Sequence, residues 1–295
     1  MIAKLDDINV IVDSIEQLPV LPGTTLRLIN VLSDVNSTIE QIVDTIRHDQ
    51  NLTAQVLKLC NSAFFGFSRR ITSLQNAVTY LGARQLLQLV FNVHCKSTFN
   101  HSNEGYGLLA GMLWKHSNAV AIASEKISNH KQLEPSAGLF FTAGLLHDIG
   151  KVILDSTLKE HYQQVIELAT AEKIRFDEAE KRILGFSHEE VGELIARKWQ
   201  LPEAIASAAK YHHCPECYKG NDEEIRQVVD IVHISDSLVM MLGIGLGYDG
   251  LMYRVDDNLI EKYRIQPEYL DSLGVEILLE LDKLEKLYSG GGERS

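Results

Sequence analysis

Long apolar runs are absent from this chain of 295 residues. A membrane-spanning helix needs roughly 18 or more consecutive apolar residues, and no segment of the sequence comes near that length. The first residues, Met1 to Asp7, also lack the charged start and apolar centre of a signal peptide. We therefore expect a cytoplasmic protein that has no membrane partner.

Positive charge is scarce as well. The chain has 40 acidic and 28 basic residues, which gives a net charge of -12 at pH 7. The electric field of such a molecule repels nucleic acid instead of attracting it. We expect no nucleic-acid partner, and an anionic substrate would need a local positive site such as bound metal ions beside Lys151.

Cysteine is the third scarce feature. A chain of this length would need more cysteines to build a disulfide framework, so we expect reduced thiols. Two of the cysteines form a CxxC motif directly after a pair of histidines, where a zinc knuckle or a redox pair is an alternative to the exposed loop that we favour. The four cysteines are Cys60, Cys95, Cys214 and Cys217.

Alternating patterns typical of β-strands are also missing. Apolar residues recur instead at spacings of three and four, which indicates amphipathic helices throughout. With 45% hydrophobic residues the chain can bury a substantial core. The predicted fold class is therefore all-α and multi-helical.

Several residues mark the ends of the expected helices. Ser37 with Glu40, and Ser187 with Glu190, have the spacing of a capping box, and Asp49 can cap the helix that follows it. Glycines that fit helix ends are Gly66, Gly82 and Gly185.

A polar stretch that contains glycine, Thr98 to Gly107, divides the sequence. We place a domain boundary there, with an N-terminal helical part at residues 1–97 and a larger helical bundle at residues 98–288. The last residues, 289–295, lack apolar side chains and are expected to form a disordered tail.

Ionisable residues emerge from an apolar segment near the middle of the chain. The run Gly138 to Leu146 leads directly into His147, Asp148 and Lys151. Burying these three groups together is costly unless they pair or bind a metal. Imidazoles and carboxylates are the ligands that divalent iron, manganese and zinc prefer. Further candidates of the same types are His116, His188, His212, His213 and Asp236.

Each of these further candidates also has a simpler explanation. His116 can be a satisfied core histidine, and His188 an exposed residue at a helix start. A helix C-terminal dipole favours histidine at His212 and His213, and Asp236 can accept hydrogen bonds from buried groups. The dipeptide His48-Asp49, with no metal partners nearby, shows that an HD pair alone proves little. The combination of residue types and their order is what favours a metal site.

Short motifs recur along most of the chain. Those of the N-terminal half are the LPVLP opening at residues 18–22, the step from Asp49 to Leu52, Asn61-Ser62-Ala63 and Leu81-Gly82, and those that follow are His188, Trp199, Leu201-Pro202 and His212-His213. Together they resemble the HDOD family of bacterial signalling proteins. This resemblance covers most of the chain and implies an N-terminal helical subdomain packed on an HD-type helical bundle.

The order of the candidate ligands is similar to that of the HD phosphohydrolase superfamily, and HDIGK at residues 147–151 looks like the HD-GYP branch of cyclic di-GMP phosphodiesterases. No Gly-Tyr-Pro stretch follows His213, however, and Met112 stands where some members have a glutamate for a third metal, so a dinuclear site is expected. By this resemblance one metal is held by His116, His147, Asp148 and Asp236, and the second by His188, His212 and His213, with Asp148 bridging.

The resemblance implies metal-dependent hydrolysis of a small anionic phosphoester, such as a nucleotide or cyclic nucleotide. Two divalent transition-metal ions, iron or manganese ahead of zinc, would activate water, with Asp148 and Lys151 as catalytic residues. Lys151 would neutralise a phosphate oxygen. One alternative is a non-catalytic metal-binding module that acts through contacts with a signalling protein, and a second is a redox-active di-iron centre.

Overall fold

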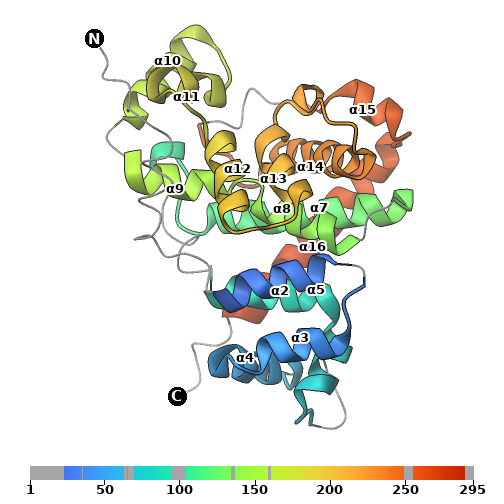
Figure 1. Cartoon of the computed structure of the whole chain (residues 1–295). Coiled ribbons are helices and arrows are strands. Elements are labelled where there is room, and N and C mark those ends of the chain that lie inside the picture. Colours follow the sequence, from blue (N-terminus) through green and yellow to red (C-terminus); the bar gives the residue numbers. More distant parts are fainter. Residues whose placement is uncertain are drawn as a thin grey trace.

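The computed structural model confirms the all-α prediction (Figure 1). It describes residues 23–34, 36–62, 65, 70–94, 104–133, 137–158, 161–248 and 255–289. Within these ranges the regular structure consists of helices, and no strand is present. None of the helices in the described ranges is long and apolar enough to cross a membrane.

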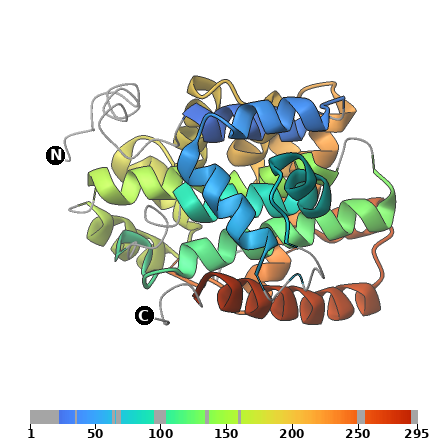
Figure 2. The ribbon, with the colours of Figure 1, turned by 90° about the horizontal axis from the view of Figure 1, so that it is seen from below.

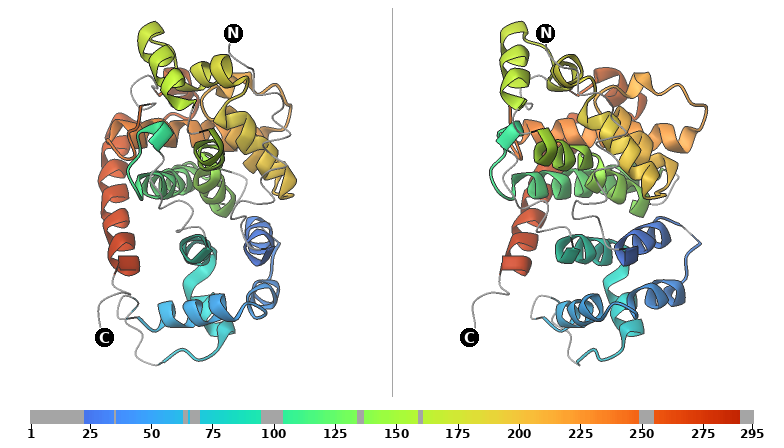
Figure 3. Two further views of the ribbon diagram at one scale, coloured as in Figure 1. Left: turned by 90° about the vertical axis from the view of Figure 1, so that its left-hand side faces the viewer. Right: turned by 60° about the vertical axis from the view of Figure 1, so that its left-hand side comes forward.

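Four helices form the N-terminal part of the structure. They pack on one another at one end of the molecule, and α2 and α5 also contact α8 of the larger part (Figure 3). The four are α2 (Gly23–Ser33), α3 (Ile39–Ile46), α4 (Gln50–Cys60) and α5 (Leu74–His94).

The remaining helices form a bundle around α7, whose residues are buried on nearly every side. The neighbours α8, α14 and α16 all pack against α7, and α16 runs along it at the surface (Figure 2). A helix that is covered by others on several sides lies at the centre of a bundle, and the polar residues that α7 buries, such as His116 and Asn118, therefore lie inside the bundle. The elements are η2 (Glu104–Tyr106), α7 (Met112–Lys131), α8 (Ala137–Leu146), α9 (Ile149–Leu158), α10 (Tyr162–Glu172), α11 (Phe176–Leu184), α12 (His188–Lys198), α13 (Glu203–Tyr211), η3 (Pro215–Cys217), α14 (Glu223–Met241), α15 (Asp257–Lys262) and α16 (Pro267–Ser289).

Two of the three predicted N-terminal caps are confirmed. Asp49 accepts a hydrogen bond from the backbone N–H of Leu52 at 2.9 Å, and the Glu190 carboxylate accepts one from the backbone N–H of Ser187 at 3.1 Å. The third prediction, Ser37 with Glu40, is wrong by one residue. The capping box that begins α3 is formed by Thr38 and Gln41.

Glycines end two helical segments as predicted. Gly82 has a φ of 72° and kinks α5, and Gly185 has a φ of 93° at the end of α11. These values lie in the left-handed region, where glycine has no steric penalty. The LPVLP opening, Gly66, residues 98–103 of the expected boundary and residues 290–295 of the expected tail lie outside the described residues. Ser289, the first residue of that tail, is the last residue of α16.

The expectation of reduced thiols is wrong for one pair of cysteines. Cys214 and Cys217 form a disulfide, with their Cα atoms 5.4 Å apart. The single turn of 3-10 helix at Pro215–Cys217 is the reason, because residues three apart lie side by side in such a turn. Cys60 is a free, buried thiol.

Candidate metal centre

The HD dipeptide lies in a turn between two helices. His147, Asp148 and Lys151 therefore do not share one continuous helix. Helix α8 ends at Leu146 and α9 begins at Ile149, so His147 and Asp148 project from the break between them. The new direction of the chain is fixed at Gly150, which packs directly on the backbone of α12.

Three helices and two turns bring the seven candidate ligands together. His116 comes from α7, His188 is the first residue of α12, and Asp236 lies in the middle of α14. His212 and His213 form the turn that directly follows α13, and His147 and Asp148 form the turn between α8 and α9. None of the seven is more than 6% exposed. Their potential donor atoms form two groups, each with all atoms within 4.8 Å of one another: Asp148, His188, His212 and His213 in one, and His116, His147 and Asp236 in the other.

The two carboxylate oxygens of Asp148 face different groups. Its Oδ2 lies 3.4 Å from Nε2 of His147 and 3.7 Å from Nε2 of His116. Its Oδ1 lies 3.5 Å from Nε2 of His212 and 3.7 Å from Nε2 of His188. Asp148 therefore stands between the two groups, with one oxygen available to each.

Asp236 makes a second link between the groups. Its Oδ1 lies 3.0 Å from Nε2 of His116 and 3.7 Å from Nε2 of His147. Its Oδ2 lies 3.6 Å from Nδ1 of His213. The two acids thus sit among five imidazoles in one buried cluster.

Most of these separations do not suit hydrogen bonds, which weaken beyond about 3.2 Å. They come close to the spacing of donors that share an ion, because two adjacent ligands bound at about 2.0–2.1 Å are about 2.8–3.4 Å apart in octahedral or tetrahedral geometry. Nε2 of His147, His188 and His212 and Oδ1 of Asp148 have no hydrogen-bond partner in the described part of the chain. An unsatisfied buried polar atom costs about 1–3 kcal/mol. The residues present therefore fit divalent metal ions.

Backbone carbonyls place a proton on Nδ1 of three of the rings. Nδ1 of His147 donates to the Gly144 carbonyl at 2.7 Å, and Nδ1 of His116 donates to the Ile244 carbonyl at 3.1 Å. The ring of His212 donates in the same way to carbonyls of its own helix. Since a carbonyl can only accept, each Nδ1 carries the proton. The lone pair of a neutral ring then lies on Nε2, which points into the cluster.

The ring of His188 is oriented by a carboxylate that the sequence analysis missed. Oε2 of Glu180 accepts from both Nδ1 and the backbone N–H of His188, at 2.7 and 2.9 Å. Oε1 of Glu180 accepts from the Tyr106 hydroxyl at 2.5 Å, and this hydroxyl accepts from Tyr162 at 2.7 Å. One signal was available in the sequence, because Glu180 lies on the apolar face of its helix between Phe176 and Leu184.

The two carboxylates of the cluster stay ionised although they are buried. Burial raises the pKa of Asp148, but the Lys151 ammonium and His147 lower it further, to well below its usual value. Nζ of Lys151 donates to Oδ2 of Asp148 at 2.8 Å. Burial also raises the pKa of Asp236, but a protonated His116 beside it, through its hydrogen bond and its charge, outweighs this effect and lowers the pKa to about 2.

The imidazoles differ in their affinity for protons. Burial lowers the pKa of His212 to about 4, and burial together with the neighbouring His212 and His188 holds the pKa of His213 well below its usual value. These two rings are neutral at pH 7, as metal ligands must be. Burial lowers the pKa of His188 as well, but the Glu180 carboxylate raises it more, to about 9.

The family model of the HDOD domain matches residues 18–215 of this chain. An HDOD domain protein of unknown function from Geobacter sulfurreducens has a similar crystal structure, with 28% identity, 97% of each chain covered and a TM-score of 0.66. A Shewanella amazonensis protein that is provisionally named a metal-dependent phosphohydrolase shares the fold, with 17% identity, 95% and 97% of the two chains covered and a TM-score of 0.55.

A curated relative is an uncharacterised protein of Treponema pallidum, strain Nichols. It is 24% identical over 259 residues, which is 88% of this chain and 48% of the relative. This chain thus spans about half the length of that relative.

Proposed function

Because this chain belongs to the HDOD domain family, we propose that it is a bacterial signal-transduction protein that hydrolyses phosphoesters at a dinuclear metal site. Six of the seven candidate ligands lie in the matched region, and Asp236 lies beyond it. The observation that carries the proposal is the position of Asp148, whose two oxygens each face a separate group of imidazoles.

In this proposal each group of donors holds one ion, and Asp148 bridges the two. Neutral imidazoles with carboxylates suit iron, manganese and zinc. When bound, such ions activate water and stabilise negative charge on a phosphoryl group. The first ion would be held by His116, His147, Asp148 and Asp236, and the second by Asp148, His188, His212 and His213.

Lys151 supplies the positive charge that a phosphoester needs. Its side chain is buried, and its ammonium group lies 2.8 Å from Oδ2 of Asp148, next to both groups of donors. A fixed cation at this position can neutralise a phosphate oxygen in surroundings from which water is largely excluded. The whole molecule carries a charge of -12, so attraction of an anion depends on this local charge. We propose a nucleotide or cyclic nucleotide as the substrate class.

The depth of the cluster favours a second candidate function. All seven donors are at least 94% buried, whereas a substrate phosphate has to reach the ions directly. A metal that is held without access would serve a signalling module that acts through protein contacts.

Metal analysis and turnover together test the proposal. Protein purified without added metal is expected to contain about two transition-metal ions per chain, as a two-metal hydrolase does. It is also expected to hydrolyse bis-p-nitrophenyl phosphate and at least one member of a panel of nucleotides and cyclic nucleotides. Bound metal without turnover on any of these substrates would support the signalling module. Protein without metal would contradict both functions.

Replacing Glu180 with glutamine is expected to weaken metal binding by about 10- to 100-fold, the usual effect of removing the partner that orients a ligand. The variant keeps the shape of the side chain but loses the charge that holds His188. Competition with a chromophoric chelator measures the affinity. The control is Glu178→Gln in the same helix, because Glu178 pairs with Arg182 at the surface and its side chain is 44% exposed. Equal affinities in the two variants would show that Glu180 does not position His188.

A further inference from the structure

The disulfide between Cys214 and Cys217 contributes little to the free energy of unfolding. It closes a loop of only four residues, and the entropy that a crosslink removes from the unfolded chain grows with loop length. The turn is also held by the backbone, since Cys214 N–H donates to Tyr211 and Cys217 N–H donates to Cys214, both at 2.9 Å. Two cysteines separated by two residues are typical of sites of thiol–disulfide exchange.

The two sulfur-bearing residues differ in accessibility. Cys217 is exposed and Cys214 is half-buried, so an external thiol meets Cys217 first. The free thiol of Cys60 is fully buried and lies against the Ala77 carbonyl in the N-terminal part. Within the described residues, a chemical probe therefore distinguishes the pair from Cys60.

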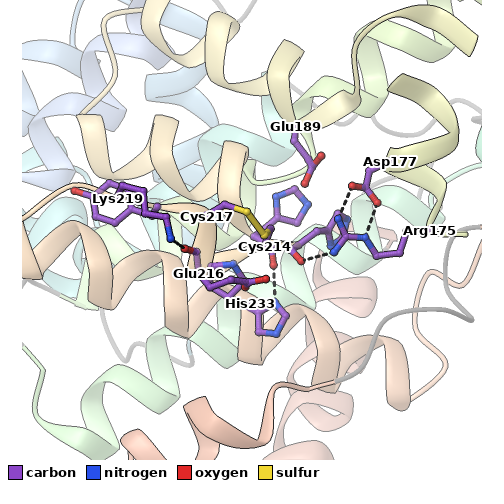
Figure 4. Close-up of a disulfide and its surroundings, with 12 residues drawn as sticks. Arg175, Asp177, Glu189, Cys214, Glu216, Cys217, Lys219 and His233 are labelled. Atoms are coloured by element: carbon purple, nitrogen blue, oxygen red, sulfur yellow. Dashed lines mark hydrogen bonds and ion pairs between the residues drawn. A yellow bond between two sulfur atoms is a disulfide. The ribbon is translucent and has the colours of Figure 1, made fainter. Parts of the chain in front are cut away.

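The disulfide directly follows two residues of the candidate metal centre. The His212 carbonyl accepts from Nδ1 of His233 at 2.6 Å, and the His213 carbonyl accepts from Nη1 of Arg175 at 3.1 Å. Figure 4 shows Arg175 and His233 approaching this segment from different sides, with the disulfide beside it. Cys214 is therefore the first residue after a stretch of backbone that positions two imidazoles.

The far end of the turn is fixed to α14. Arg226 donates to the carbonyls of Pro215, at 2.9 Å, and Tyr218, and its guanidinium lies 4.7 Å from the centre of the Tyr218 ring. The disulfide ties Cys214, beside the imidazoles, to Cys217, next to this anchored end. Reduction breaks this covalent link, so that only hydrogen bonds such as those from His233 and Arg175 position the backbone of His212 and His213.

We propose that Cys214 and Cys217 are a reversible dithiol/disulfide site that exchanges with an external dithiol, and that its oxidation strengthens the hold of His212 and His213 on metal. The redox exchange depends only on Cys214 and Cys217 and does not require a bound metal. The effect of oxidation on metal binding rests on the proposed function, because it requires a metal in the cluster.

Reduction proceeds by two exchanges. A thiolate of the external dithiol attacks Sγ of Cys217, forms a mixed disulfide and expels Cys214 as a thiolate. The second thiolate of the dithiol then attacks the first sulfur of the same dithiol molecule in the mixed disulfide. This step closes a disulfide within the dithiol and releases Cys217 as a thiolate. The protein gains two electrons and, once both thiolates are protonated, two protons, while the dithiol becomes a disulfide. Oxidation by a disulfide is the reverse reaction.

Thiol trapping tests the redox site in the full chain. Native protein is equilibrated with mixtures of reduced and oxidised dithiothreitol, quenched with iodoacetamide and analysed by mass spectrometry. The peptide Tyr211–Lys219 is expected to pass between zero and two alkyl groups in one reversible transition, while Cys60 stays unmodified. A pair that is reduced only after denaturation, or that does not reoxidise in the native protein, would overturn the proposal.

Metal release tests the coupling. Oxidised protein, and reduced protein desalted without oxygen, are mixed with excess EDTA, and the reduced form is expected to lose metal about tenfold faster, at the lower end of the effects of outer-shell changes. The double variant Cys214→Ser/Cys217→Ser is expected to release metal at the faster rate under both conditions. Equal rates for oxidised and reduced wild type would overturn the coupling. Protein that holds no metal would refute the proposed function and the coupling together. The thiol-trapping experiment would still show whether Cys214 and Cys217 exchange reversibly.

Discussion

Replacing Asp148 with alanine is expected to remove both metal ions and all measurable phosphoester hydrolysis. The reason is that one side chain serves both groups of donors, with Oδ2 facing His147 and His116 and Oδ1 facing His212 and His188. Loss of a bridging carboxylate therefore weakens two sites at once. We expect the metal content to fall from about two ions to none, and the turnover to fall by roughly 1,000-fold or more. Elemental analysis and a phosphodiester assay measure the two effects.

The chain contains a matched control for this substitution. Asp49 is the acid of a second HD dipeptide, yet it caps α4 and lies in the N-terminal part of the molecule. Asp49→Ala is expected to cost about 1 kcal/mol of stability, as the loss of an N-terminal cap does, and to leave metal content and turnover unchanged. Full activity in a folded Asp148→Ala protein would refute our assignment of Asp148.

A second variant separates loss of metal from loss of fold. The alanine substitution leaves the buried ammonium of Lys151 without the Asp148 carboxylate to which it donates, and breaking a buried pair costs about 3–5 kcal/mol. Asp148→Asn preserves the shape of the side chain and one oxygen acceptor for Lys151, but it removes the charge and the second oxygen ligand. We expect this variant to fold and still to lack both ions. A circular dichroism spectrum checks the fold.

The residues of the cluster could be predicted from the sequence because few side chains bind transition metals. His116, His188 and Asp236 were singled out by type and order, and the structure brings them together with the HD pair in one buried cluster. Glu180 was not found, because its role depends on a hydrogen bond to a ring eight residues away across a helix boundary. Its place on the apolar face of α11 indicates a buried acid, but the sequence does not show which group that acid contacts.

Local geometry limited the prediction in two other places. Ser37 and Thr38 are adjacent and equally able to cap a helix, so hydrophobic periodicity cannot choose between them, and Thr38 is the residue used. The disulfide was also missed, because few and scattered cysteines argue only against a framework of crosslinks. Whether Cys214 and Cys217 meet depends on the short turn of 3-10 helix between them.

Replacing Gly150 with alanine is expected to disrupt the group of donors that contains Asp148, His188, His212 and His213. A Cβ atom at this position would lie 1.9 Å from the carbonyl oxygen of His188 and 2.9 Å from the backbone nitrogen of Gly192. Both are backbone atoms of α12, so no side chain can rotate away and α9 has to move off α12. Since α12 carries His188 and α9 follows Asp148 directly, that movement separates two residues assigned to one ion. We expect a loss of about 3 kcal/mol of stability, at the upper end of typical overpacking effects, and at least one ion fewer per chain.

Urea unfolding and elemental analysis measure the two effects of Gly150→Ala. Gly23→Ala is the control, because the nearest atom to its added Cβ is the flexible end of Arg27 at 3.8 Å. That variant is expected to change stability by less than about 1 kcal/mol and to keep all of its metal. If Gly150→Ala also kept its metal and stability, the close contact of α9 with α12 would not be what places His188 opposite Asp148. Because this contact is between backbones, it explains why the fourth residue of the HDIGK segment has no side chain.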